Sequence, residues 1–125
     1  MKIAIPVESD HLSLHFGQCS YYEIFGVKDA EVISDEIVQP SLQETDELPE
    51  WLLSQGVSAV ITCRIENNIL NRLIENKMNV FIETPLKHPA DLIEDLLEGR
   101  LFSGKYSGGR FGQYRNQITE ISNHK

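Results

Sequence analysis

Residues 58–82 read Ser-Ala-Val-Ile-Thr-Cys-Arg-Ile-Glu-Asn-Asn-Ile-Leu-Asn-Arg-Leu-Ile-Glu-Asn-Lys-Met-Asn-Val-Phe-Ile. The apolar run 58–62 predicts a buried strand, and the run 79–82 predicts another. Between them, apolar residues recur at helical spacing over 66–76, which predicts a helix with one buried face. A strand, a helix and a second strand of these lengths form a right-handed parallel crossover. The stretch therefore predicts an α/β fold.

The first forty residues predict three more strands. Residues 2–7 are apolar and β-branched, and 21–27 and 31–38 form the two arms of a hairpin. The polar segment 8–20 predicts a loop. Counted along the chain, the simplest strand order is 3-2-1-4-5 in a mixed five-stranded sheet, with the first, fourth and fifth strands parallel. Flanking helices are expected at 48–55, 66–76 and 89–98.

Two loops carry the side chains with the most distinctive chemistry. His15-Phe16-Gly17-Gln18-Cys19 follows the first strand, and Cys63-Arg64 follows the fourth. Imidazole and thiolate are the side chains that best bind soft and borderline metals. The predicted strand order makes the crevice beyond these two strands a topological switch point, where α/β sheets place ligands. His15, Cys19 and Cys63 are therefore candidate metal ligands around one crevice.

A simpler interpretation of the same residues stays open. Cys19 and Cys63 are 44 positions apart, and free cysteine is often no more than a small buried hydrophobic residue. His15 would then cap a helix or a backbone turn. The two interpretations differ in whether the thiols face the crevice.

Composition limits the class of protein. The chain has 125 residues, 41% of them hydrophobic and 24% charged, which is typical of one soluble domain. It lacks both a signal-peptide pattern and an apolar run long enough to cross a membrane. We therefore expect a cytoplasmic protein without a membrane partner, whose two cysteines are reduced thiols.

The net charge of −8 is distributed unevenly. Residues 1–99 carry 6 basic and 18 acidic side chains, whereas residues 100–125 carry 5 basic and 1 acidic. The acidic body should repel nucleic acid. Residues 103–125 are rich in glycine and lack periodicity, which predicts a mobile basic tail after a domain of residues 1–102. Pairing with the body or another subunit, as in a homodimer, and binding to an acidic partner are open alternatives for the tail. Its interleaved basic and aromatic residues are only a weak signal for single-stranded nucleic acid.

Several stretches together resemble the dinitrogenase iron–molybdenum cofactor biosynthesis family. They are the opening strand Met1–Val7, the motif Leu14-His15-Phe16-Gly17-Gln18-Cys19, the strand Tyr22–Phe25 and the final helix ending at Leu97-Glu98-Gly99-Arg100-Leu101. The resemblance covers about residues 1–102. It implies a three-layer RNase H-like fold and a small carrier or chaperone of iron–sulfur or iron–molybdenum clusters, working with metallocofactor-assembly proteins.

The resemblance carries over one functional residue, because His15 matches the family's histidine in that motif. The chemistry of the residues around the predicted crevice supplies the other roles: His15, Phe16, Gly17 and Arg64 are expected to contact the cargo, and His15, Cys19 and Cys63 to ligate its metal. The family usually has a glycine-rich turn after the fourth strand, where this chain has Cys63 and Arg64. Here a thiol and a guanidinium replace a turn suited to close backbone approach. The family also usually has a basic residue where this chain has Gln18.

Three function classes follow. The first is a non-catalytic carrier of a metal cluster, in which Arg64 offsets the anionic charge of the cargo. The second is a metal-free module that binds a small ligand or a protein at the same crevice. The third is an enzyme, which is disfavoured because Glu8 and Asp10 lack further carboxylates for two metal ions, and His15 with Cys19 lacks a third orienting group.

Overall fold

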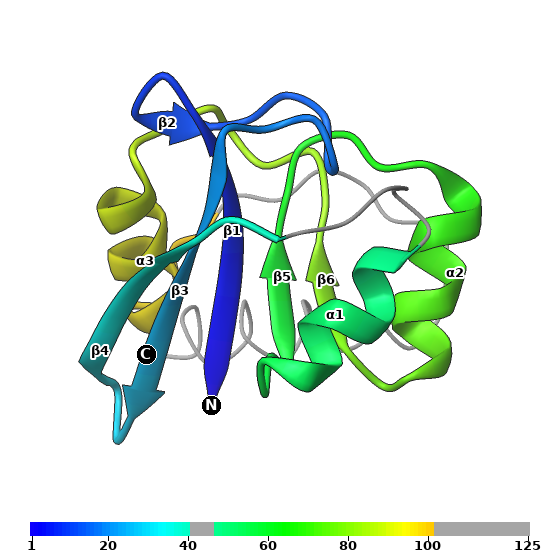
Figure 1. Cartoon of the computed structure of the whole chain (residues 1–125). Helices are drawn as coiled ribbons and strands as arrows, with labels where there is room; N and C mark the ends of the chain where they lie inside the picture. Colours follow the sequence, from blue (N-terminus) through cyan, green and yellow to red (C-terminus); the bar gives the residue numbers. More distant parts are fainter. Residues whose placement is uncertain (41–46, 102–125) are drawn as a thin grey trace.

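The computed structural model describes residues 1–40 and 47–101 (Figure 1). Its strands are β1 (Lys2–Glu8), β2 (His11–Leu12), β3 (Tyr21–Lys28), β4 (Glu31–Val38), β5 (Ala59–Ile61) and β6 (Asn79–Phe81). Its helices are α1 (Leu48–Ser54), α2 (Asn67–Glu75) and α3 (Pro89–Leu97). The predicted helices and the five longer strands are confirmed to within a residue or two at their ends. The predicted tail at 103–125 lies outside the described residues.

One mixed sheet forms the middle of the fold. Its strand order is β4-β3-β1-β5-β6, and β2 pairs with β1 off this path. β1, β5 and β6 are parallel, whereas β3 runs antiparallel to both β1 and β4. The order and directions predicted for the five longer strands are confirmed.

The prediction of a loop over 8–20 and of five strands was wrong in one detail. β1 turns back into β2 through Ser9 and Asp10, whose φ angles are 53° and 68°, and Glu8 pairs with His11. Two central residues with positive φ make the tight turn that suits a hairpin. Such turns usually contain glycine or asparagine. Because Ser9-Asp10 contains neither, the sequence did not indicate a hairpin here, and β2 is too short to be recognised by itself.

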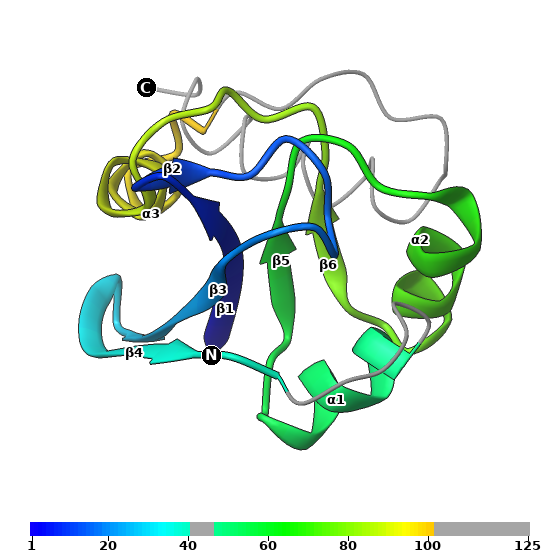
Figure 2. The ribbon, with the colours of Figure 1, turned by 45° about the horizontal axis from the view of Figure 1, so that its top comes forward.

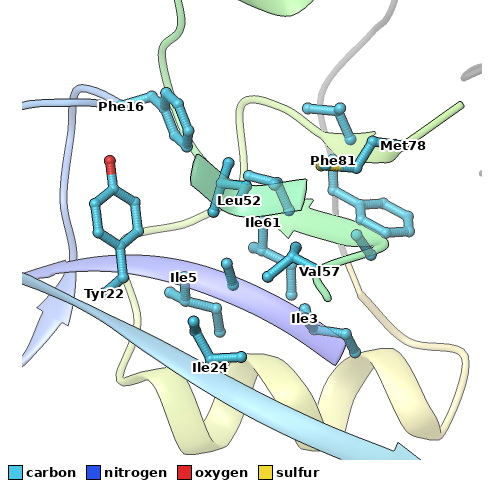
Figure 3. Close-up of a cluster of buried hydrophobic side chains, with 14 of the residues drawn as sticks. Ile3, Ile5, Phe16, Tyr22, Ile24, Leu52, Val57, Ile61, Met78 and Phe81 are labelled. Atoms are coloured by element: carbon cyan, nitrogen blue, oxygen red, sulfur yellow. The ribbon is translucent and has the colours of Figure 1, made fainter. Parts of the chain in front are cut away.

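The helices complete three layers. α1 and α2 lie on one face of the sheet and α3 lies on the other (Figures 1 and 2). Tyr22 of β3 packs against Trp51 of α1, with ring centroids 5.4 Å apart. Since alternate strand residues share a face, this contact assigns Tyr22 and Ile24 to the side of α1. Figure 3 shows part of the apolar cluster that fills the interior around β1.

No helix within residues 1–40 and 47–101 has the length and apolar character needed to cross a membrane.

Candidate functional site

The loops after β2 and β5 are joined by backbone hydrogen bonds. Phe16 N donates to Arg64 O at 2.8 Å, and Arg64 N donates to Leu14 O at 2.9 Å. These bonds form a parallel bridge between His15 and Arg64. The predicted strand order placed these two loops around one crevice, and the His15–Arg64 bridge is where they meet.

Ser13 holds the His15 loop in shape. Its side chain is buried, and its hydroxyl donates to Gln18 O at 2.8 Å and lies 3.2 Å from His15 O. Gln18 N donates to the same His15 carbonyl at 3.1 Å, and Gly17 between them has a φ of 93°, where glycine is favoured. The sequence argument missed Ser13, because nothing in the sequence signals that its hydroxyl turns inward.

A cleft of about 200 Å³ opens beside the bridge. It is lined by His15, Phe16, Gln18, Arg64, Ile65 and Glu66. His15, Gln18 and Arg64 are exposed to solvent, whereas Phe16 is buried and forms part of the apolar wall. Neither the His15 imidazole nor the Arg64 guanidinium makes a side-chain hydrogen bond or an ion pair with another residue in the described ranges. A ligand at the cleft would therefore displace no side-chain partner of either residue within those ranges.

α2 begins at the same cleft. Its N-cap is Glu66, which makes no side-chain capping bond, and the helix runs for nine residues from Asn67. The first amides of a helix carry partial positive charge, which favours an anion at this end. The Glu66 carboxylate opposes that preference, whereas the Arg64 guanidinium adds to it. The sequence argument included Arg64 but not Ile65 or Glu66.

Cys19 lies outside the cleft lining and points toward the interior. Its thiol is half-buried, and burial raises its pKa despite nearby hydrogen-bond donors, chiefly the Tyr22 hydroxyl. Tyr22 is almost fully buried, and burial beside Cys19 raises its pKa as well. The Tyr22 hydroxyl has no partner at full hydrogen-bond geometry within the described part of the chain, although Cys19 and the Gly17 amide lie close to it. Cys19 is thus a protonated thiol that faces a phenol.

Cys63 also lies outside the lining, although it directly precedes Arg64. It is half-buried, and burial raises the pKa of its thiol while the Arg64 guanidinium opposes that shift. The Glu83 carboxylate adds to the rise. Cys63 is therefore also a thiol rather than a thiolate at neutral pH.

The three predicted metal ligands do not form a ready-made site. Within residues 1–40 and 47–101, no group of three or more histidine, cysteine, aspartate or glutamate side chains is placed to hold a metal ion. His15 lines the cleft, whereas Cys19 and Cys63 occupy separate half-buried positions. The ligand roles of His15, Cys19 and Cys63 stay a prediction.

The loop after β6 supports this edge of the sheet without entering the cleft. Lys87 O accepts a hydrogen bond from Leu12 N of β2 at 2.9 Å. Thr84 is buried, and its hydroxyl lies 3.4 Å from Phe81 O. This loop fixes β2 and the start of the His15 loop in place.

Comparison with known protein families gives a match over residues 1–99 to the family described as dinitrogenase iron-molybdenum cofactor. The match covers most of the chain, so this protein belongs to that family. The resemblance noted in the sequence is confirmed.

Solved structures show the same fold. The crystal structure of PH0822 is 24% identical and covers 82% of this chain and 94% of its own, with a TM-score of 0.77. A Methanocaldococcus jannaschii protein provisionally described as a dinitrogenase is 21% identical and covers 86% of this chain and 97% of its own, with a TM-score of 0.68. The apo form of the orange protein from Desulfovibrio gigas is 13% identical and covers 82% and 92%, with a TM-score of 0.69. At these identities the likeness is one of fold.

One curated relative matches over a short stretch. An uncharacterized protein of Methanocaldococcus jannaschii, MJ0580, is 38% identical over 39 residues. The matched stretch is 31% of this chain and about a third of that protein's length.

Proposed function

We propose that this protein is a non-catalytic carrier of an iron–sulfur or iron–molybdenum type cluster, accessory to metallocofactor assembly. The observation that carries the proposal is the His15–Arg64 bridge, which places an imidazole and a guanidinium on the wall of one open cleft. Membership of the iron–molybdenum cofactor family supports the choice of cargo.

The charges of the cleft suit an anionic cargo. Metal–sulfur clusters with thiolate ligands carry net negative charge, and a guanidinium can offset it and donate to cluster sulfur. The Arg64 side chain and the first amides of α2 supply that complement, against the opposing charge of the Glu66 carboxylate in the same lining. His15 supplies one neutral nitrogen ligand, and Phe16 and Ile65 supply apolar contact that keeps water away from the sulfides.

The thiols suit a carrier that also releases its cargo. Metal binding to a thiol releases its proton, so a thiol with a raised pKa binds metal less tightly at neutral pH. Cys63 directly precedes Arg64 and is less deeply buried than Cys19, and we propose that a change in the bridged loop brings its thiol to the cleft. Cys19 is held beside Tyr22 and contributes only if the His15 loop moves. We therefore place Cys63 and His15 first among the ligands.

Anaerobic reconstitution tests the proposal. The purified protein is incubated with iron and sulfide, and separately with zinc and with molybdate, and is then analysed by visible absorbance and metal content after gel filtration. We expect broad visible absorption and retained iron in the natural sequence, with a loss of several-fold in Cys63→Ser and in His15→Ala. His11→Ala is the matched control, because His11 is also an exposed histidine but lies on β2, outside the cleft lining. A natural sequence that stays colourless and free of iron contradicts the proposal.

A second candidate, a metal-free module for a small anion, is favoured by one observation. The cleft lining includes Arg64 and Gln18 but neither cysteine. For this function we expect molybdate to bind in calorimetry without iron or sulfide, and Arg64→Ala to abolish binding while Cys19→Ser/Cys63→Ser leaves it unchanged. Equal molybdate binding by Arg64→Ala and the natural sequence contradicts this second function.

A further inference from the structure

β4 forms one edge of the sheet and is unusually open to solvent. Seven of its eight residues are exposed, on both faces of the strand. They include three aliphatic side chains, Val32, Ile33 and Ile37, which are 45%, 64% and 66% exposed. Proteins normally shorten, charge or cover such an edge, because it invites pairing with another strand. β4 carries acidic side chains, but they leave three aliphatic side chains exposed on a long edge strand, which suggests that something covers it.

The charges of β4 indicate what kind of segment binds along this edge. Its charged residues are all acidic, namely Glu31, Asp35 and Glu36. No ion pair among residues 1–40 and 47–101 involves any of them. Glu23 on β3 adds a fourth carboxyl group beside Asp35. The complement to this edge is an extended segment that carries both basic and apolar side chains.

The chain itself contains such a segment. Residues 102–125 carry four basic residues and one acidic residue, in contrast to the acidic body. Aromatic and aliphatic side chains are interleaved with the basic ones; they are Phe102, Tyr106, Phe111, Tyr114, Ile118 and Ile121. The described part ends at Leu101, just after α3, which lies against the sheet (Figure 2). Twenty-four further residues reach at most about 80 Å when extended, so the β4 edge is within reach.

We propose that the basic C-terminal segment, residues 102–125, pairs with β4 of its own chain as an added edge strand. Main-chain hydrogen bonds supply the affinity in this mode of binding, and side chains supply the register. In the proposed pairing, Arg110 and Arg115 would face the acidic residues of β4, and the aromatic residues between them would cover Val32, Ile33 and Ile37. A second copy of β4 fits this edge less well, because it brings more carboxylates to an acidic edge in a chain of net charge −8.

Hydrogen exchange of the β4 amides tests the proposal in the full-length protein. The exchange of residues 31–38 is compared between the natural sequence and Lys105→Glu/Arg110→Glu/Arg115→Glu. We expect exchange at alternate β4 amides to be about ten-fold faster in the triple variant, because three screened attractions become repulsions. A compensating charge reversal, Glu31→Lys/Glu36→Lys, is combined with the triple variant. Because it restores opposite charges on the two segments, β4 exchange should return toward its natural rate.

Controls separate this pairing from other effects. Lys77→Glu changes the charge at the end of α2, far along the chain from β4, and should leave β4 exchange unchanged. Equal β4 exchange in the natural and triple-variant proteins overturns the proposal, as does protection that grows with protein concentration, which would assign the edge to a second copy. The exchange is measured without cluster or metal, so its outcome is independent of the carrier function.

Discussion

Glu23 lies in the middle of β3, where its carboxyl group faces that of Asp35 on β4. Partial burial, a hydrogen bond with Asp35 and repulsion by its charge raise the pKa of Glu23 to about 7. The two residues are diagonal neighbours across the strand pair, because Glu23 pairs with Ile37 and Asp35 pairs with Phe25. At neutral pH the pair therefore shares a proton that two isolated carboxyl groups would have lost.

This pair predicts a pH dependence of folding. A carboxyl group whose pKa is raised in the folded state binds more protons folded than unfolded, so stability falls as pH rises from about 4.5 to 7. Glu23→Gln removes that effect, and we expect it to raise the free energy of unfolding at pH 8 by about 1 kcal/mol after allowance for solvent screening. Urea unfolding at pH 5 and at pH 8 measures it. A variant whose stability follows the same pH curve as the natural protein contradicts the assignment.

Ser13 gives a second residue-scale prediction, because one hydroxyl serves two carbonyls of the His15 loop. Removing the hydroxyl in Ser13→Ala leaves the Gln18 carbonyl without this donor, whereas the His15 carbonyl keeps the Gln18 amide. We expect a loss of about 1–2 kcal/mol of unfolding free energy. Ser58→Ala is the matched control, since its exposed hydroxyl lies 3.5 Å from its acceptor and should contribute little. Equal losses in the two variants, measured by urea unfolding, would show that Ser13 does not hold the loop.

At the scale of elements, the side chain of Ser34 on β4 lies against Gly26 of β3. A Cβ atom on Gly26 would lie 2.2 Å from Ser34 Oγ, and the pairing register shifts directly after Gly26. The bulge increases the local twist of β4 at the sheet edge. Gly26 is thus a site where a side chain of the neighbouring strand occupies the space that a Cβ would need.

This contact predicts a non-additive pair of substitutions. In a Ser34→Ala background, Gly26→Ala should stabilise the protein by about 0.5–1 kcal/mol, because alanine loses less backbone entropy than glycine. In the natural sequence, Gly26→Ala should not increase stability, because the new Cβ would displace the Ser34 hydroxyl from its preferred rotamer. A double-mutant cycle by thermal or urea unfolding should therefore give a coupling of about 1 kcal/mol. Additive effects would show that the strands adjust without cost.

The elements also show what the sequence could predict. Strand order followed from a hairpin at one end and a helix-linked crossover at the other, since each has few allowed arrangements. β2 did not follow, because its turn depends on the positive φ of Ser9 and Asp10, which most sequences avoid. The meeting of the His15 and Arg64 loops followed from strand order alone. The inward turn of Cys19 did not, because it depends on how its thiol packs beside Tyr22.

At the scale of the whole molecule, cargo binding is expected to depend on pH. Burial raises the thiol pKa of both Cys19 and Cys63, so each thiolate ligand formed must release a proton. We expect cluster loading to increase from pH 6.5 to pH 8.5 and the loaded protein to lose iron faster to a chelator at the lower pH. Iron analysis across this range measures it. Cys19→Ser/Cys63→Ser is the control, and the reduced amount of iron that it still loads should not depend on pH. Loading of the natural sequence that is independent of pH would exclude thiolate ligands.

The body of the protein is acidic, and the cargo proposed for it is anionic. Net charge of this sign repels an anionic cargo at long range, so capture depends on the short-range contacts of Arg64, His15 and the α2 amides. The proposed carrier would therefore select against free anions that lack a good fit and would accept cargo delivered at close quarters by a protein partner.

The bridge between His15 and Arg64 has a consequence for how this fold can change. The two loops are joined through the backbone groups of Leu14, Phe16 and Arg64, and any residue other than proline could supply the same donors. The side chains at positions 15 and 64 therefore contribute little to holding the two loops together. Mutations there can alter what is recognised at little cost in folding free energy. The scaffold thus leaves recognition open to rapid divergence while its framework stays intact.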